Sequence, residues 1–69
     1  MRLSARNQLT GTVAGIENGA VTTIVKINLT GGQSVTASIT KEAVEELGLK
    51  VGEPVTAIIK SSEVLIAVD

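Results

Sequence analysis

β-Branched residues are the largest class in this chain, and they restrict what it can fold into. Ile, Val and Thr supply 24 of its 69 residues, and side chains of this kind favour pleated strands over helices. The clearest pattern is Val21–Leu29, where a face of Val, Thr, Val, Ile and Leu alternates with a more polar one. The length allows one small domain, so a single domain built from strands is expected over residues 1–69.

Glycine-containing turns divide the N-terminal half into strands. An earlier strand is expected over about Gln8–Ile16, joined to the alternating strand by a tight hairpin turn at Asn18-Gly19. Gly31-Gly32 predicts a second hairpin, which leads into a third strand. Gly11 and Gly15 fall inside the first strand, where they predict bulges or sharp bends of the kind that a small barrel needs at its corners.

The hydrophobic period changes where the third strand ends, at Thr40. This residue is a suitable N-cap for a short helix over Lys41–Leu47, and Gly48 is the residue type expected just beyond the C-terminal end of such a helix. Val44 and Leu47 are expected on one side of this helix.

Two more strands complete the expected fold. The turn Val51-Gly52-Glu53-Pro54 leads into a fourth strand over Val55–Lys60, and a fifth strand is expected over Val64–Val68. Five short strands with one helix between the third and the fourth are typical of an OB-type barrel. The predicted fold class is therefore all-β, an OB-like five-stranded β-barrel with one short helix between strands 3 and 4.

The residue types that are absent exclude several kinds of chemistry. The chain has no Cys, no His and no aromatic residue, so it lacks a thiolate nucleophile, the usual proton shuttle and the usual transition-metal ligands. Its serines have no histidine to activate them, and the glutamates that cluster on the expected helix do not have metal-ligand spacing. Neither catalysis nor a site for a free metal cation is expected.

Charge and hydropathy argue against nucleic-acid and membrane partners. Six basic and seven acidic residues give a formal charge of −1, and there is no aromatic platform on which bases could stack. The N-terminal residues lack the apolar stretch of a signal peptide, and the longest apolar run, Val64–Val68, is too short to cross a bilayer. A cytoplasmic location is therefore expected.

The chain is also short for a protein that has no disulfide. Small domains gain stability from a metal, a disulfide or a partner subunit, and only the last fits this composition. Four apolar residues fall on faces that the alternation marks as outward: Ile24, Ile58, Leu65 and Ala67. Either they form an interface between copies, or the twist of the barrel and its helix covers them. The first interpretation is favoured, so a homo-oligomer is expected.

Three segments are rich in hydrogen-bond donors and poor in acidic groups. They are the N-terminal run Ser4–Gln8, the segment Lys60–Ser62, and Thr40 at the expected helix start. Each also has a plain structural interpretation, respectively a solvated N-terminus, an ordinary strand exit and a helix cap. Together they supply Arg, Lys, hydroxyls and backbone N–H groups, which is a donor set suited to a fully ionised anion.

The opening segment carries a motif of a known family. Ser4-Ala5-Arg6-Asn7-Gln8-Leu9 followed by Gly11 resembles the signature of the molybdenum-pterin-binding or Mop family, the molbindins. The similarity continues along the chain in the segments Gly19–Thr22, Gly31-Gly32, Val44–Gly48 and Thr56–Val64. The chain is thus similar to a single stand-alone Mop domain.

This resemblance implies an OB-like barrel that assembles as a homohexamer, a trimer of dimers, with molybdate or tungstate bound between subunits. The residues that it implies for the oxyanion site are Ser4 and Arg6 from one subunit and Thr40, Lys60 and Ser61 from its neighbour. A second class of site is implied near the trimer axis, where the ion would face the backbone N–H groups of Ala20, Val21 and Thr22. Family members often carry Ser where this chain has Ala43, so one hydroxyl of the implied site is missing here.

The resemblance and the donor inventory agree on the ligand. Molybdate and tungstate are tetrahedral dianions that only accept hydrogen bonds, whereas a protonated phosphate also donates one. Because none of the matched positions is an acidic residue that could accept that bond, phosphate is expected to be disfavoured. The expected function is cytoplasmic binding of molybdate or tungstate for intracellular molybdenum storage or homeostasis. The alternative is a stand-alone oxyanion sensor, or a structural module held together by anions, that regulates a partner.

Overall fold

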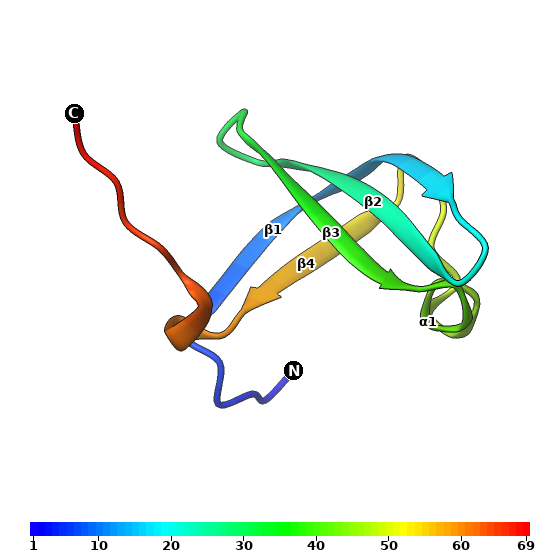
Figure 1. Ribbon diagram of the computed structural model, residues 1–69, viewed down its shortest axis with the longest axis horizontal. Coiled ribbons are helices and arrows are strands. Elements are labelled where there is room, and N and C mark those ends of the chain that lie inside the picture. Colours follow the sequence, from blue (N-terminus) through cyan, green and yellow to red (C-terminus); the bar gives the residue numbers. More distant parts are fainter.

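Four antiparallel strands form one curled sheet in the order β3-β2-β1-β4 in the computed structural model, which describes residues 1–69 (Figure 1). The elements in chain order are β1 (Asn7–Asn18), β2 (Thr22–Leu29), β3 (Ser34–Thr40), α1 (Lys41–Leu47), β4 (Pro54–Ile59) and the single 3-10 turn η1 (Ser61–Glu63). The first four predicted strands and the helix between the third and the fourth are confirmed. Since β3 and β4 end the sheet, each has one edge without a strand beside it.

The core is small and lies on the face of β2 that the alternation predicts. Only six of the 69 residues are buried, and three of them are Thr23, Val25 and Ile27 of β2; the others are Val13, Val44 and Ala57. The Thr23 hydroxyl donates to the Asn18 side-chain oxygen over 3.4 Å, so the one buried polar side chain has a partner. A core of this size stabilises a single chain only modestly.

The two glycines inside β1 have different roles. The pairing of β1 with β2 shifts register between Val13 and Gly15, which confirms a bulge there. Gly11 lies in regular pairing with both neighbouring strands, opposite Leu29 on one side and Val55 on the other. A Cβ atom at Gly11 would collide with the backbone carbonyl oxygen of Asn28. Gly11 therefore permits a close approach between strands and is not a bulge.

The β1–β2 hairpin forms, but Asn18-Gly19 is not its reversing turn. The chain reverses at Ala20-Val21, and the Gly19 N–H donates to the Thr22 carbonyl over 2.9 Å. Gly19 does not have the positive φ that a type I′ turn requires. A Cβ at Gly19 would lie only 2.6 Å from the Thr22 carbonyl oxygen, so the glycine is required by this close contact.

The ends of α1 are those that the sequence predicts. The Thr40 hydroxyl accepts from the Ala43 N–H over 3.0 Å, and Gly48 has the left-handed φ of 64° that ends the helix. Of the two apolar residues expected on one side of the helix, Val44 is buried and Leu47 is exposed. The reason is that the helix has only two turns and stops at Gly48, which leaves Leu47 at the rim of an open groove between β3 and β4.

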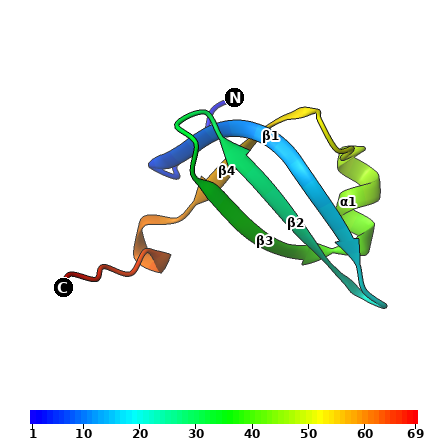
Figure 2. The same ribbon diagram turned by 90° about the horizontal axis from the view of Figure 1, so that it is seen from above.

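The fifth strand expected over Val64–Val68 is wrong for the single chain. After β4 the backbone passes through η1, and residues 64–69 then extend away from the sheet (Figures 1 and 2). A strand needs an edge with which to exchange hydrogen bonds, and this segment reaches neither free edge of its own sheet. The barrel is therefore open by one strand.

Candidate functional site

The end of β4 and the start of β1 bring two distant segments together. Asn7 is paired with Ile59 at the last position of the β1–β4 ladder, and the Asn7 side-chain amide also donates to the Ile59 carbonyl over 3.1 Å. Residues before Asn7 and residues after Ile59 consequently leave the sheet side by side. Two of the donor-rich segments in the sequence, Ser4–Gln8 and Lys60–Ser62, are neighbours for this reason.

Between these segments lies an open pocket of about 360 Å³. We call it the hydroxyl pocket, and it is lined by Ser4, Ala5, Lys60, Ser61 and Ser62. The pocket contains three hydroxyl groups and one ammonium group, and no carboxylate. Its chemistry is that of a site for an anion that accepts hydrogen bonds.

The turn η1 shapes one wall of the hydroxyl pocket. The Glu63 N–H donates to the Lys60 carbonyl over 2.9 Å, and the Val64 N–H donates to the Ser61 carbonyl over 3.3 Å. These bonds curl residues 60–64 so that Ser61 and Ser62 both line the pocket. Of the residues expected in the oxyanion site, Ser4, Lys60 and Ser61 are close to one another in a single chain.

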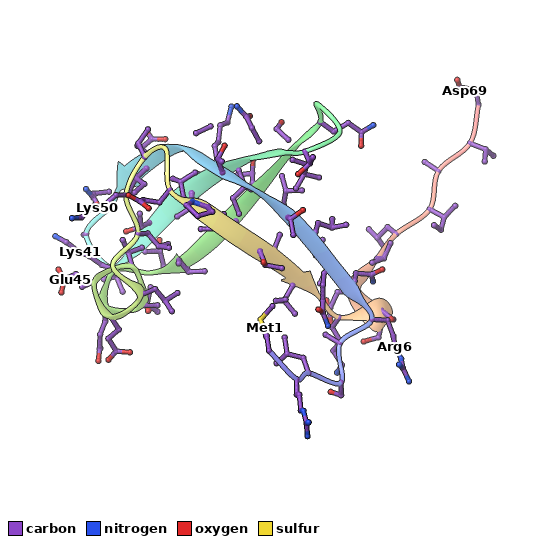
Figure 3. All side chains as sticks on the ribbon, turned by 180° about the vertical axis from the view of Figure 1, so that it is seen from behind. Met1, Arg6, Lys41, Glu45, Lys50 and Asp69 are labelled. Atoms are coloured by element: carbon purple, nitrogen blue, oxygen red, sulfur yellow. The ribbon has the colours of Figure 1, made fainter.

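Arg6 is near the hydroxyl pocket but does not line it. Its side chain is exposed, and Figure 3 shows it beside the turn that follows β4, with the guanidinium pointing into solvent. Ala5 and Ser62 line the pocket although they were not among the expected site residues. The signal for Ser62 was its place in the polar segment Lys60–Ser62, and only the curl of η1 shows that it turns toward Ser4.

The remaining expected residues lie at the opposite end of the sheet, beside α1 (Figure 1). Thr40 caps the helix and is paired with Thr22. The Val21 carbonyl accepts from the Lys41 N–H over 2.9 Å, which ties the β1–β2 turn to the helix start. Ala20, Val21 and Thr22 are exposed and adjacent to Thr40, so the structure forms two separate groups of candidate residues in each chain.

The two ends of the molecule differ in charge. Near the hydroxyl pocket the sequence places Arg2, Arg6 and Lys60 beside one acid, Glu63, and the C-terminal Asp69 lies at the same end of the molecule (Figure 3). At the other end α1 alone carries Glu42, Glu45 and Glu46, and Figure 3 shows Glu45 there with Lys41 and Lys50. The hydroxyl pocket is therefore at the more basic end, where an anion is favoured.

The structure contains neither a carboxylate cluster for a metal ion nor a helix that could span a membrane. No group of three or more Asp or Glu side chains is close enough together to hold a metal ion. No helix has the length and apolar character needed to cross a membrane.

Known proteins resemble this chain over nearly all its length. The TOBE domain family matches residues 3–66. Molybdenum-pterin-binding protein 1 of Clostridium pasteurianum is 47% identical over 66 residues, which cover 96% of this chain and 97% of that protein. MopII from the same organism has a structure similar to this one, with a TM-score of 0.92 and 45% identity, covering 97% of this chain and 100% of MopII.

A molybdate-bound structure is also similar. The cytoplasmic molybdate-binding protein ModG superposes with a TM-score of 0.85 and 57% identity over 88% of this chain, which corresponds to 43% of the ModG chain. These likenesses confirm the predicted OB-like fold class. The names of the relatives are those of binding proteins, in agreement with the expectation of a binding role for this chain. The chain therefore belongs to the TOBE domain family and, within it, to the molybdenum-pterin-binding or Mop proteins.

Proposed function

We propose that this protein binds molybdate or tungstate at the hydroxyl pocket, between copies of itself, and serves in cytoplasmic molybdenum storage or homeostasis. The observation that carries the proposal is the pocket itself, where Ser4, Lys60, Ser61 and Ser62 present donors and a positive charge with no carboxylate among the lining residues. The bound molybdate in the related ModG structure supports the choice of anion.

The lining chemistry suits an anion that accepts hydrogen bonds at every oxygen. A serine hydroxyl can rotate to donate, and the Lys60 ammonium supplies a charge and three N–H groups. A protonated phosphate would require an acceptor opposite its own O–H, and no acidic side chain lines the pocket to supply one. Sulfate meets the same hydrogen-bonding requirement as molybdate, so it must be distinguished by size.

One chain supplies only part of such a site. The hydroxyl pocket is open to solvent, and Thr40 is at the other end of a molecule that is 35 Å long. The Thr40 hydroxyl accepts one bond from Ala43, so its own proton is free to be donated to a ligand. In our proposal Thr40 of a second copy closes the pocket, and Arg6 turns from solvent toward the anion.

The charges at the two ends favour this arrangement. The pocket end carries Arg2, Arg6 and Lys60 with Glu63 and Asp69, while the Thr40 end carries the three glutamates of α1 with Lys41 and Lys50, so the first end is the more basic. Opposite charges attract when the pocket end of one copy meets the helix end of another. The small core, with six buried residues, also supports assembly, and we propose a homohexamer with further anion sites near Ala20, Val21 and Thr22.

Titration calorimetry with molybdate, tungstate, sulfate and phosphate tests the anion function. We expect heat from molybdate and tungstate at micromolar concentrations and much weaker binding of phosphate. The absence of heat with both molybdate and tungstate would refute the proposed function.

Paired lysine variants test the position of the site. Removing one partner of a buried charge pair typically costs about 2–5 kcal/mol, which is a loss of about 30-fold or more in affinity, so we expect this loss for Lys60→Ala. Lys26→Ala is the matched control because Lys26 is an exposed lysine in the middle of β2, away from both groups of candidate residues. Equal affinities of the two variants would show that the anion does not bind at the hydroxyl pocket.

Native mass spectrometry separates storage from the alternative of an anion-held or sensing module. A storage protein is expected to form the same oligomer with and without molybdate and to load several ions. Assembly that requires molybdate would instead favour the anion-held module.

A further inference from the structure

The two walls of the hydroxyl pocket come from distant parts of the chain and are joined only at their base. Ser4 and Ala5 form one wall, and residues 60–62 form the other. Backbone pairing between β1 and β4 stops at Asn7 and Ile59, so neither wall belongs to the ladder. No hydrogen bond joins residues 1–6 to residues 60–69. The separation of the walls is therefore controlled by the last pair of the ladder.

The Asn7 side chain adds a bond at this last pair. Its amide donates to the Ile59 carbonyl over 3.1 Å, in a partly buried position that limits competition from water. It is the only side-chain hydrogen bond between β1 and β4. The ends of paired strands open more readily than their middles. The Asn7 bond therefore holds closed a pair that would otherwise fray.

The tied pair also lies between the two basic residues of the proposed site. Arg6 directly precedes Asn7, and Lys60 directly follows Ile59. Movement of the backbone at the tied pair consequently shifts both positive charges, together with the hydroxyl groups beyond them.

The other amide of this segment acts differently. The Gln8 side chain donates to the Ala5 carbonyl over 3.1 Å, in an exposed position and within one wall. This bond curls the N-terminal wall but does not reach the other one. Asn7 is thus the one side chain of the segment that joins the two walls.

We propose that Asn7 is a positioning residue that sets the width of the hydroxyl pocket, and thereby its preference for molybdate over the smaller sulfate. This role rests on the anion function proposed above, in which sulfate meets the same hydrogen-bonding requirement and differs in size. An anion gains most when it contacts both walls at once. Walls held at a fixed separation cannot close on a smaller anion, whereas walls that move can.

The test is a ratio of two dissociation constants, that of sulfate divided by that of molybdate. Calorimetry on the full-length protein measures molybdate directly and sulfate by displacement of molybdate, at constant ionic strength. Asn7→Ala is expected to lower this ratio about two- to ten-fold, which corresponds to the net contribution of one hydrogen bond. A ratio that is unchanged or higher, or sulfate that displaces no molybdate from the variant, would overturn the proposal.

The ratio separates positioning from a purely structural role. If Asn7 only stabilised the fold, its loss would reduce the fraction of competent protein, and both affinities would fall by the same factor. Asn7→Asp keeps the size of the side chain but has no N–H to donate, and its added charge acts equally on two dianions. We therefore expect the same fall in the ratio for Asn7→Asp, and an unchanged ratio there would also contradict the proposal.

The matched control is Asn28→Ala. Asn28 is an exposed asparagine in β2, paired with Thr12 and not with the start of β1. Its variant is expected to keep the ratio of the unmodified protein. An equal fall in Asn28→Ala and Asn7→Ala would show that the width of the pocket does not depend on the bond to Ile59.

A measurement without anion tests the tie between the walls on its own. Nitrogen relaxation of backbone amides is expected to show greater mobility at Ser61 and Ser62 in Asn7→Ala, with Val44 of α1 unchanged. Unchanged mobility at both serines would overturn the tie, whatever the anion result. The absence of molybdate heat in the unmodified protein would refute the anion function and with it the role in selectivity. Clear molybdate heat with an unchanged ratio would refute the role of Asn7 alone.

Discussion

Alanine substitutions at Gly11 and Gly15 test how closely β1 approaches β2. Both lie in the same strand, and neither has a positive φ. A Cβ at Gly11 would collide with the Asn28 carbonyl oxygen and lie 3.1 Å from Ile27 Cγ2, whereas a Cβ at Gly15 would meet nothing within 4 Å. The same substitution, Gly to Ala, should therefore have opposite effects at the two positions.

The structure sets the size of each effect. At Gly11 the obstacle is backbone, and β1 is paired on both sides there, so the strand has no direction in which to move away. Overpacking of this kind costs about 1–3 kcal/mol. At Gly15, replacement by Ala restricts the unfolded chain without a clash, which stabilises a protein by about 0.4–1 kcal/mol.

The assay is thermal unfolding followed by far-ultraviolet circular dichroism, since the chain has no aromatic residue to give a fluorescence signal. For a domain of this size, 1 kcal/mol shifts the Tm by about 4–8 °C. Gly11→Ala is expected to lower the Tm by at least about 4 °C, and Gly15→Ala to raise it slightly. All proteins are compared at one chain concentration, because the stability of an oligomer depends on concentration. Equal Tm values for the two variants would refute the close approach of β1 to β2.

Three further substitutions have defined outcomes. Thr40→Ala removes the side chain that accepts from the Ala43 N–H and should cost about 1 kcal/mol in chemical denaturation, while Thr40→Ser should retain most of that stability because its hydroxyl can cap the helix. Asn7→Ala removes the hydrogen bond to the Ile59 carbonyl, so it should lower the free energy of unfolding by about 0.5–1.5 kcal/mol. It should also speed amide exchange at the start of β1, and Gln8→Ala at the exposed neighbouring residue is the comparison. Val13→Ala removes two methyl-sized groups from a side chain that is 1% exposed. The free energy of unfolding should fall by at least about 1.6 kcal/mol, which is the transfer free energy of those groups. A loss below about 0.5 kcal/mol would contradict the place of Val13 in the core.

Local patterns in the sequence were sufficient to predict most of the fold. The alternation in β2 predicted its buried face, and the Thr40 and Gly48 signals predicted both ends of α1, because each depends on neighbouring residues and standard backbone chemistry. The roles of Gly11 and Gly19 were not predictable in this way. Each glycine is required by a carbonyl from another strand or the far side of a turn, and a contact of that kind is known only when the pairing is known.

The fifth strand shows a different limit of sequence reasoning. Residues 64–68 have the composition of a strand, but a strand also requires an edge, and the turn at η1 directs this segment away from its own sheet. Sequence patterns indicate which conformation a segment favours and carry no information on whether the edge of a sheet lies within its reach. The same applies to Leu47, which is apolar at a helix position that faces an unfilled groove.

The candidate site was predictable in part. The polar segments Ser4–Gln8 and Lys60–Ser62 were identified from composition and motif, and the β1–β4 pairing brings them together. The contribution of Ser62 depends on the curl of η1, which a run of polar residues does not specify. The separation of Thr40 from the pocket became evident only in the structure, and it is the reason that our account requires a second copy.

The most direct test of this account is the position of the anion itself. Crystals of the molybdate-loaded protein, measured at the molybdenum absorption edge, give an anomalous signal that identifies the metal without reference to the protein. We predict a peak within hydrogen-bonding distance of Lys60 and Ser61 of one copy and Thr40 of another. A peak bounded by a single chain, or one in the apolar groove between β3 and β4, would contradict the account.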